Sequence, residues 1–144
     1  MSVHFSSKSN EWRTPNDLYR RLNKEFKFTL DPCSTTLNAL CFKNYTENDN
    51  GLIQDWSNET VFMNPPYGRA IGKWIKKAYE ESLKGSTVVC LIPSRTDTVW
   101  WHDYCVRGEI RFIKGRLKFS NSKTSAPFPS AIVIFKDQEQ AEKR

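Results

Sequence analysis

The sequence predicts an α/β fold in which a mainly parallel sheet carries an antiparallel edge. Apolar, strand-like runs alternate with helical patterns through the middle of the chain, which is typical of parallel strands joined by helices. The clearest run, residues 87–92, is uninterrupted and β-branched, as expected for a strand that is covered on both faces. Two further strand-like runs, residues 109–113 and 131–135, lie close together near the end of the chain and indicate the antiparallel edge.

The length of 144 residues predicts a single domain, residues 1–144, with a core over about 11–135 and loose ends at 1–10 and 136–144. Neither a membrane-spanning apolar run nor a signal-peptide core is present in the sequence, so we expect a cytoplasmic protein. The four cysteines have no paired spacing, which favours buried thiols in a reducing compartment. We expect no metal site; the alternative is a zinc site built from Cys33, Cys41, His102 and Cys105.

The first half of the chain contains one clear helix and one short strand. Residues 14–17 (TPND) predict a helix start, with Thr14 as the cap, Pro15 at the first helical position and an acid in the first turn. Apolar residues at a spacing of four, Leu18, Leu22 and Phe26, then form one stripe. Residues 28–30 predict a strand that ends at Asp31, and residues 33–59 are irregular, with at most one short helix.

The second half is more regular. A strand is expected over 61–63 and an amphipathic helix over about 70–84, which Gly85 ends. After the strand at 87–92, Thr96 is expected to cap a helix that reaches Val106. A short additional strand is expected at 117–119.

Asn64, Pro65, Pro66 and Tyr67 stand between the strand at 61–63 and the helix that follows, where open α/β sheets carry their chemistry. This motif resembles the target-amine motif of S-adenosylmethionine-dependent amino-methyltransferases. An exocyclic amine conjugated to a ring is a poor nucleophile. Hydrogen bonds from the amine to two acceptors would make its nitrogen more nucleophilic; the expected acceptors are the Asn64 side-chain carbonyl and the Pro65 backbone carbonyl. The prolines stiffen the turn, and Tyr67 offers a ring on which an extruded base can stack. The alternative is a proline-rich turn whose tyrosine merely packs.

The methyl donor needs its own pocket, and here too the chain resembles methyltransferases. Asp31 and Pro32 resemble the end of their first strand, where an acid helps to hold S-adenosylmethionine. Trp12, Thr14 and Pro15 resemble the element that packs against the methionine end of the cofactor, and Asn64 adjoins the same site. Asp49 and Asp55 lie in a segment resembling the one that contacts adenine or ribose. Each also has an ordinary alternative: a packing residue, a helix cap, a turn residue or a loop acid facing water.

One departure from the general methyltransferase pattern is the loss of the glycines that normally follow the first strand. Residues 34–36 are Ser-Thr-Thr instead. Together with the irregular stretch before the motif, this implies a reduced sheet with one or two cofactor-side strands lost.

Taken in order, the segments TPNDLY, LDPCS, NDNGLIQDW, MNPPYGRAIGKWIKKA, LIPSRTDTVWWH and IKGRLKF…APFPSAIVIF closely resemble the DNA N6-adenine methyltransferase family that is widespread in bacteriophages. The resemblance covers about residues 11–135. It implies a compact Rossmann-like fold, S-adenosylmethionine as the cofactor, adenine in DNA as the substrate and a phage-encoded protein.

The net charge is +6, and basic residues gather late in the chain. We expect a DNA-binding stripe that neutralises phosphates, formed by Arg69, Arg111, Lys114, Arg116, Lys118 and Lys123. A solvated basic face is the alternative. The same motif chemistry also allows N4 of cytosine, RNA or a protein glutamine as the methyl acceptor. An alternative of a different functional class is a catalytically inactive relic of the fold that only binds DNA. Self-association is left open.

Overall fold

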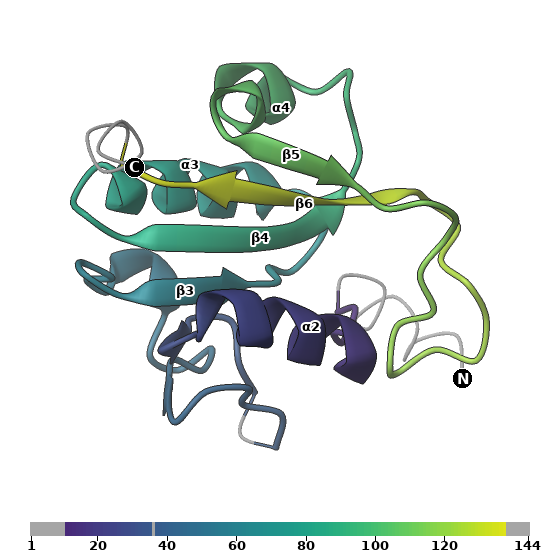
Figure 1. The fold of residues 1–144 in the computed structure, drawn as a ribbon, viewed down its shortest axis with the longest axis horizontal. Coiled ribbons are helices and arrows are strands. Elements are labelled where there is room, and N and C mark those ends of the chain that lie inside the picture. Colours follow the sequence, from purple (N-terminus) through teal and green to yellow (C-terminus); the bar gives the residue numbers. More distant parts are fainter. Residues whose placement is uncertain (1–10, 36, 138–144) are drawn as a thin grey trace.

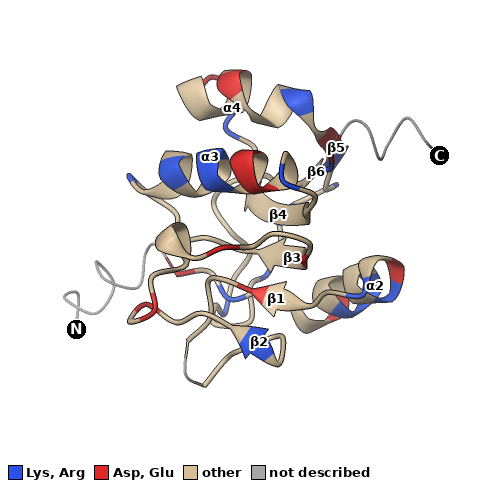
Figure 2. Cartoon of the chain, turned by 90° about the vertical axis from the view of Figure 1, so that its left-hand side faces the viewer, with Lys and Arg blue, Asp and Glu red and all other residues tan. Residues whose placement is uncertain are grey.

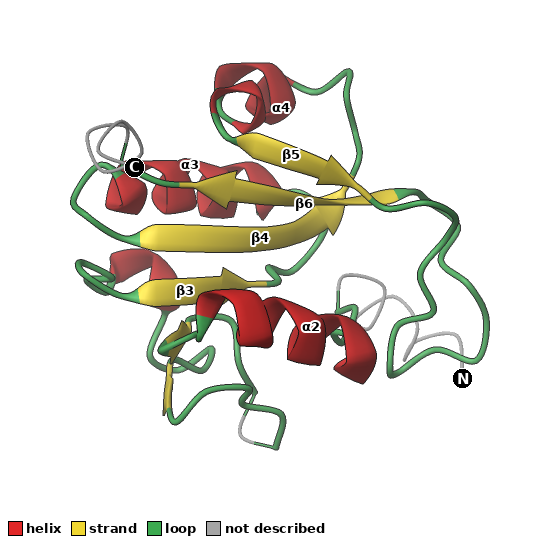
Figure 3. Cartoon of the chain, in the orientation of Figure 1, coloured by secondary structure: helices red, strands yellow, loops and turns green. Residues whose placement is uncertain are grey.

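The computed structural model describes residues 11–35 and 37–137, which form a six-stranded sheet with helices on both faces. The strand order is β2-β1-β3-β4-β6-β5. Strands β1 (Leu30–Asp31), β2 (Lys43–Asn44), β3 (Thr60–Met63) and β4 (Thr87–Pro93) are parallel, whereas β6 (Ser130–Phe135) runs antiparallel to β4, and β5 (Glu109–Phe112) antiparallel to β6. The predicted class is therefore confirmed. Figure 3 shows this sheet in the centre of the molecule.

The central strands form the core because helices cover both of their faces. Helix α2 (Asn16–Phe26) lies on one face, and α3 (Ile71–Ser82) and α4 (Val99–Asp103) lie on the other (Figures 1 and 2). From α2, the ring of Tyr19 packs edge-on against Phe62 of β3 at 5.3 Å. From α3, the Tyr79 ring contacts Phe135 of β6 at 5.8 Å. Every residue of β4 from Val88 to Pro93 is buried, as its apolar sequence predicts.

The structure corrects several expected boundaries. Helix α2 begins at Asn16, so Pro15 is at the N-cap position rather than the first helical position, and no side chain caps the helix. Thr14 lies one residue before the cap, and its hydroxyl accepts from Asn64 instead. Thr98 rather than Thr96 caps α4, since its hydroxyl accepts from Trp101 N, and the predicted long helix is divided into α4 and the 3-10 turn η2 (Cys105–Arg107). Residues 117–119 are not a strand.

The irregular region 33–59 contains only β2 and the 3-10 turn η1 (Gly51–Ile53) as regular elements among its described residues. Strands β1 and β2 are two residues long each, so the sheet is shortened on this side. The loose ends expected at 1–10 and 136–144 lie outside the described residues, except for Lys136 and Asp137. In the part of the chain that the structure describes, no helix combines the length and apolar character that crossing a bilayer requires.

Candidate active site

The candidate site lies between β1 and β3, where the order in which the chain adds strands to the sheet reverses. From β1 the chain proceeds to β2 on one side, and then returns to β3 and β4 on the other side. Such a switch point leaves a crevice at the carboxyl ends of the two strands that flank it. Asp31 is the last residue of β1, and Asn64 directly follows β3. The topology therefore brings together two residues that the sequence separates by a long irregular segment.

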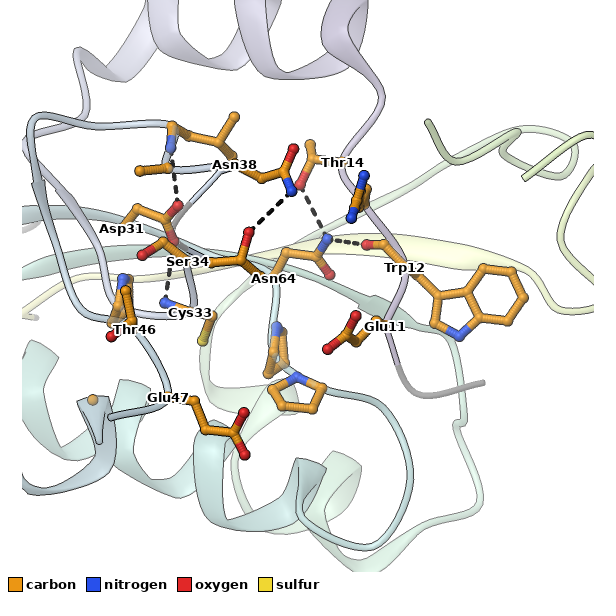
Figure 4. Close-up of a pocket in the computed structure, with 18 of the residues that line it drawn as sticks. Glu11, Trp12, Thr14, Asp31, Cys33, Ser34, Asn38, Thr46, Glu47 and Asn64 are labelled. Carbon is orange, nitrogen blue, oxygen red and sulfur yellow. Dashed lines mark hydrogen bonds between the residues drawn. The ribbon is translucent and has the colours of Figure 1, made fainter. Parts of the chain in front are cut away.

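A cavity of about 620 Å³ opens at this position. Its wall includes Asp31 and Pro32 from the end of β1, Asn64, Pro65 and Pro66 from the motif, and Trp12 and Thr14 from the segment before α2. Its size is in the range of pockets that bind cofactors and other small molecules. Figure 4 shows Asn64 near the middle of the lining residues, between Asp31 and Trp12.

The side-chain amide of Asn64 is held through its nitrogen. Nδ2 donates to the backbone carbonyl of Trp12 and to Thr14 Oγ1, the latter at 3.0 Å (Figure 4). A backbone carbonyl can only accept, so this contact determines which end of the amide faces Trp12. Asn64 Oδ1 is buried, and no donor among the described residues reaches it. Buried polar atoms almost always have a partner, which makes this oxygen a strong candidate for ligand recognition.

Tyr67 does not lie where a base-stacking residue was expected. Its ring is 6% exposed and is not part of the cavity lining, and its hydroxyl donates to Leu91 O of β4 at 3.1 Å. The rings of Phe119 and Phe128 pack edge-on against it at 6.3 and 5.7 Å. Desolvation by burial raises the pKa of Tyr67 well above its ordinary value. The ring thus packs in the core here, beneath the segment that joins β5 to β6.

Asp31 is buried at the end of β1, and both of its carboxylate oxygens accept backbone hydrogen bonds. Oδ1 accepts from Cys33 N and Oδ2 from Leu40 N, both at 3.1 Å. Burial raises the pKa of Asp31 to about 6, although the two backbone donors act in the opposite direction. The carboxylate therefore holds the loop after β1, and Asp31 also lines the cavity.

The two acids expected at the cofactor's adenine or ribose are not in the cavity wall. Asp49 accepts from Thr46 N at 2.9 Å and closes the turn in which it lies. Asp55 is exposed, and hydrogen bonds from Ser57 hold its pKa below the ordinary value. Glu47 and Asn50, which the sequence reasoning missed, line the cavity instead. The segment predicted to contact the adenine or ribose therefore reaches the cavity through Glu47 and Asn50, whereas the Asp49 carboxylate is used in a local turn.

The segment before α2 reaches the cavity with Trp12 and Thr14, whereas Pro15 is not in the lining. Thr14 is 8% exposed and contacts Asn64 rather than capping the helix. Trp12 packs edge-on against Phe119 and Phe128 at 5.4 and 5.1 Å. Residues 114–129, which we term the β5–β6 loop, therefore close over this segment. In Figure 1 the loop projects beyond the carboxyl end of β4.

Gly51 and Trp74 are among the other lining residues that the sequence reasoning did not identify. Gly51 packs so closely that a Cβ there would lie 2.4 Å from the Pro32 carbonyl oxygen and 3.1 Å from the Trp74 ring. Trp74 is a buried residue of α3, and it also borders the cavity. The Asn50-Gly51 pair, which is typical of a tight turn, was the available signal for Gly51.

The basic residues fall into two groups. Arg111 is engaged by carboxylates: its NH1 and NH2 donate to Glu25 at 2.8 and 2.7 Å, and its Nε donates to Glu109. It also lies over the Phe26 ring, so it joins β5 to α2 rather than offering a free charge to DNA. The remaining expected residues are exposed: Arg69, Lys114, Arg116, Lys118 and Lys123. Figure 2 shows that α2 and α3 carry interspersed charges of both signs, unlike the β5–β6 loop, residues 114–129, which contains no acid.

The zinc alternative finds no support in the described part of the chain, where no three His, Cys, Asp or Glu side chains come close enough to hold a metal ion. The His102 ring contacts the Thr96 carbonyl oxygen at 2.7 Å, and Cys105 is buried in the core.

Comparison with known proteins identifies the family of the chain. Residues 2–143 match the family model described as DNA N-6-adenine-methyltransferase (Dam). A protein of Haemophilus phage HP1 named DNA N-6-adenine-methyltransferase is 31% identical over 134 residues, covering 86% of this chain and 77% of that protein. A protein of the same name from Escherichia phage T1 is 32% identical over 92 residues, which span 62% of this chain and 38% of that protein. The chain belongs to the DNA N-6-adenine-methyltransferase (Dam) family.

Proposed function

We propose that this protein transfers a methyl group from S-adenosylmethionine to N6 of adenine in DNA, and that Asn64 binds the target amine. Family membership supports the reaction class, and the match to phage proteins makes a phage origin plausible. The single observation that carries the proposal is Asn64 Oδ1, a buried acceptor without a donor in the wall of a cavity. The exocyclic amine of adenine can donate an N–H hydrogen bond to this oxygen.

The chemistry of the amine explains why such an acceptor helps. The N6 lone pair is delocalised into the purine ring, so the amine is a weak nucleophile. A hydrogen bond from N6–H to Asn64 Oδ1, and a second to the Pro65 carbonyl, would favour tetrahedral geometry and direct the lone pair out of the ring plane. Pro65 and Pro66 restrict the backbone at this turn, which keeps both acceptors in place before substrate binds.

The cavity has the charge and size expected for the cofactor. When bound, S-adenosylmethionine supplies a methyl group that its sulfonium charge makes electrophilic. The wall contains three carboxylates, those of Glu11, Asp31 and Glu47, and one guanidinium, that of Arg13; this excess of acids suits a ligand with sulfonium, ammonium and carboxylate charges. We assign Asp31, Pro32 and Trp12 to cofactor binding in the part of the wall nearest Asn64, where the Thr14 hydroxyl is already occupied by the Asn64 amide. Glu47 and Asn50 then replace Asp49 and Asp55 as the residues for the ribose and adenine.

DNA contact is assigned to the exposed basic residues of the β5–β6 loop, with Arg69 beside the motif. The loop lies at the end of the sheet where β3 ends (Figure 1), and Asn64 directly follows β3, so phosphates bound to the loop would be close to the cavity. Arg111 is left out because Glu25 and Glu109 already neutralise it. Tyr67 can stack on a base only if Phe119 and Phe128 move away from its ring. We place the reaction in the host cytoplasm, where the DNA is accessible.

The proposal is tested by expressing the protein in a bacterial host that lacks adenine methylation, digesting the host DNA and analysing its nucleosides by mass spectrometry. We expect N6-methyladenine with the wild-type protein and none with Asn64→Ala. Asn48→Ala, an exposed asparagine outside the cavity wall, is the matched control and should behave as the wild type. N4-methylcytosine in the DNA, methylated RNA alone, or no methylated base with the folded wild-type protein would each overturn the assignment.

A further inference from the structure

Thr14 and the carbonyl of Trp12 are the only groups among the described residues that bind the side-chain nitrogen of Asn64. They come from a segment 50 and 52 positions earlier in the chain. If the amide were rotated by half a turn, Oδ1 would face the Trp12 carbonyl oxygen, and two acceptors would repel each other. The segment before α2 therefore determines that Oδ1, and not Nδ2, is left for a ligand.

That segment is itself held by the β5–β6 loop. Ser120 N donates to Arg13 O at 2.9 Å, and Ser120 Oγ donates to Thr14 O at 2.8 Å. Asn121 completes the arrangement, because its Oδ1 accepts from Arg13 N at 3.0 Å and its Nδ2 donates to Glu11 O at 2.9 Å. The backbone on either side of Thr14 is thus fixed by the loop that carries Lys118 and Lys123.

We infer that Thr14 is a positioning residue for methyl transfer, which holds the Asn64 amide so that Oδ1 faces the target amine. The inference rests on the proposed function and adds a residue that acts through Asn64 without touching the reacting atoms. A merely structural role for Thr14 would require only its shape, which valine reproduces. A positioning role requires its hydroxyl oxygen, which serine retains and valine lacks.

The experiment compares Thr14→Val with Thr14→Ser in steady-state methyl transfer, with calorimetry of S-adenosylmethionine binding alongside. For Thr14→Val we expect kcat to fall roughly tenfold, the usual effect of one lost hydrogen bond in a site, with KM for DNA and Kd for the cofactor within about twofold. Thr14→Ser should restore most of the rate. Thr96→Val, at an exposed threonine outside the site, controls for the substitution itself.

Equal kcat values for Thr14→Val and wild type, or a Thr14→Ser variant as slow as Thr14→Val, would overturn the inference while leaving the proposed function intact. A second measurement needs no variant at Thr14: hydrogen exchange of the Asn64 side-chain amide in the wild-type protein, followed by NMR. Slow exchange is expected because two acceptors hold the nitrogen. Exchange as fast as in an exposed asparagine would contradict the inference even if Thr14→Val failed to fold. A folded wild type without methyl transfer would overturn the proposed function first.

Discussion

Asp31 has a structural role in the loop after β1, and in the proposed function it also binds the cofactor. As a structural residue, its carboxylate accepts from Cys33 N and Leu40 N and holds the loop after β1. As a cofactor residue, it would face the positive charge of the methionine moiety. Burial raises its pKa to about 6, so the carboxyl is partly protonated in mildly acidic solution. A cationic ligand favours the ionised form, and binding must then release the proton.

We therefore predict that the affinity for S-adenosylmethionine rises with pH up to about 6 and is flat above it. Below pH 6 the slope should approach at most about tenfold per pH unit, because one proton is released per ligand bound. Calorimetry in two buffers of different ionisation enthalpy measures that proton. In Asp31→Asn the pH dependence in this window should disappear. An unchanged dependence in Asp31→Asn would exclude Asp31 as its source.

Thr14 shows why one residue's role was not predictable. The pattern Thr-Pro-Asn-Asp is typical of a helix start, and a helix does begin at Asn16. The local pattern cannot report that the hydroxyl contacts Asn64, since that contact joins positions 50 residues apart. Asp49 lies outside the cavity wall for the opposite reason: its carboxylate accepts hydrogen bonds from a local partner, Thr46.

At the level of elements, the short turn η1 forms a structural link between the two sides of the cavity. Gly51 lies against the Pro32 carbonyl after β1 and against the Trp74 ring of α3, and its own carbonyl accepts from Trp56 Nε1 at 3.0 Å. The contact with Pro32 is to a backbone atom, which cannot rotate away as a side chain can. The space at this glycine is therefore a requirement of the packing.

Gly51→Ala should lower the free energy of unfolding by about 1–3 kcal/mol, the usual cost of overpacking a buried site. It should also weaken cofactor binding, because Pro32 and Trp74 line the cavity. Urea unfolding and calorimetry measure the two effects. Gly72→Ala is the control: its Cβ would meet Trp100 at an ordinary 3.4 Å on a helix, so it should be neutral or slightly stabilising. Equal stability of the two variants would refute the packing argument.

The β5–β6 loop and strand β5 should differ in their response to charge removal. Lys118→Ala should reduce the slope of log affinity for DNA against log salt by about 0.9, the effect of one lost phosphate contact. Arg111→Ala should leave that slope unchanged, because Glu25 and Glu109 neutralise the guanidinium. Instead it should cost up to about 1 kcal/mol of folding stability. The measurement is a DNA-binding titration at several salt concentrations. The opposite ranking would place the interface on β5.

At the scale of the whole molecule, the sequence predicted the fold best in the strands that are buried on both faces. The apolar runs at β3, β4 and β6 predicted the centre of the sheet, because strands covered on both faces have no polar residues to obscure the pattern. Strands β1 and β2 are too short to form a pattern, so only Leu30 was anticipated there. Phe119 suggested a strand, but its apolar character reflects packing with Trp12 and Tyr67 instead.

The candidate site was predictable to the extent that it follows strand ends. Asp31 and Asn64 were identified in this way, and both line the cavity. The placement of Tyr67 was not predictable, because it depends on how the distant β5–β6 loop folds back over the motif. The loop contacts both the segment before α2 and the ring of Tyr67 in the motif. The cavity wall, Asn64 and the basic loop are therefore connected to one another at one end of the sheet.

The most direct test of the central claim follows the methyl group itself. Purified protein is incubated with unmethylated DNA and with S-adenosylmethionine that carries a deuterated methyl group. The DNA is then digested, and its nucleosides are separated and identified by mass spectrometry. The account predicts deuterated N6-methyladenine from the wild-type protein and none from Asn64→Ala, which should still bind the cofactor. Label on cytosine, or labelled adenine from folded Asn64→Ala at the wild-type rate, would contradict it.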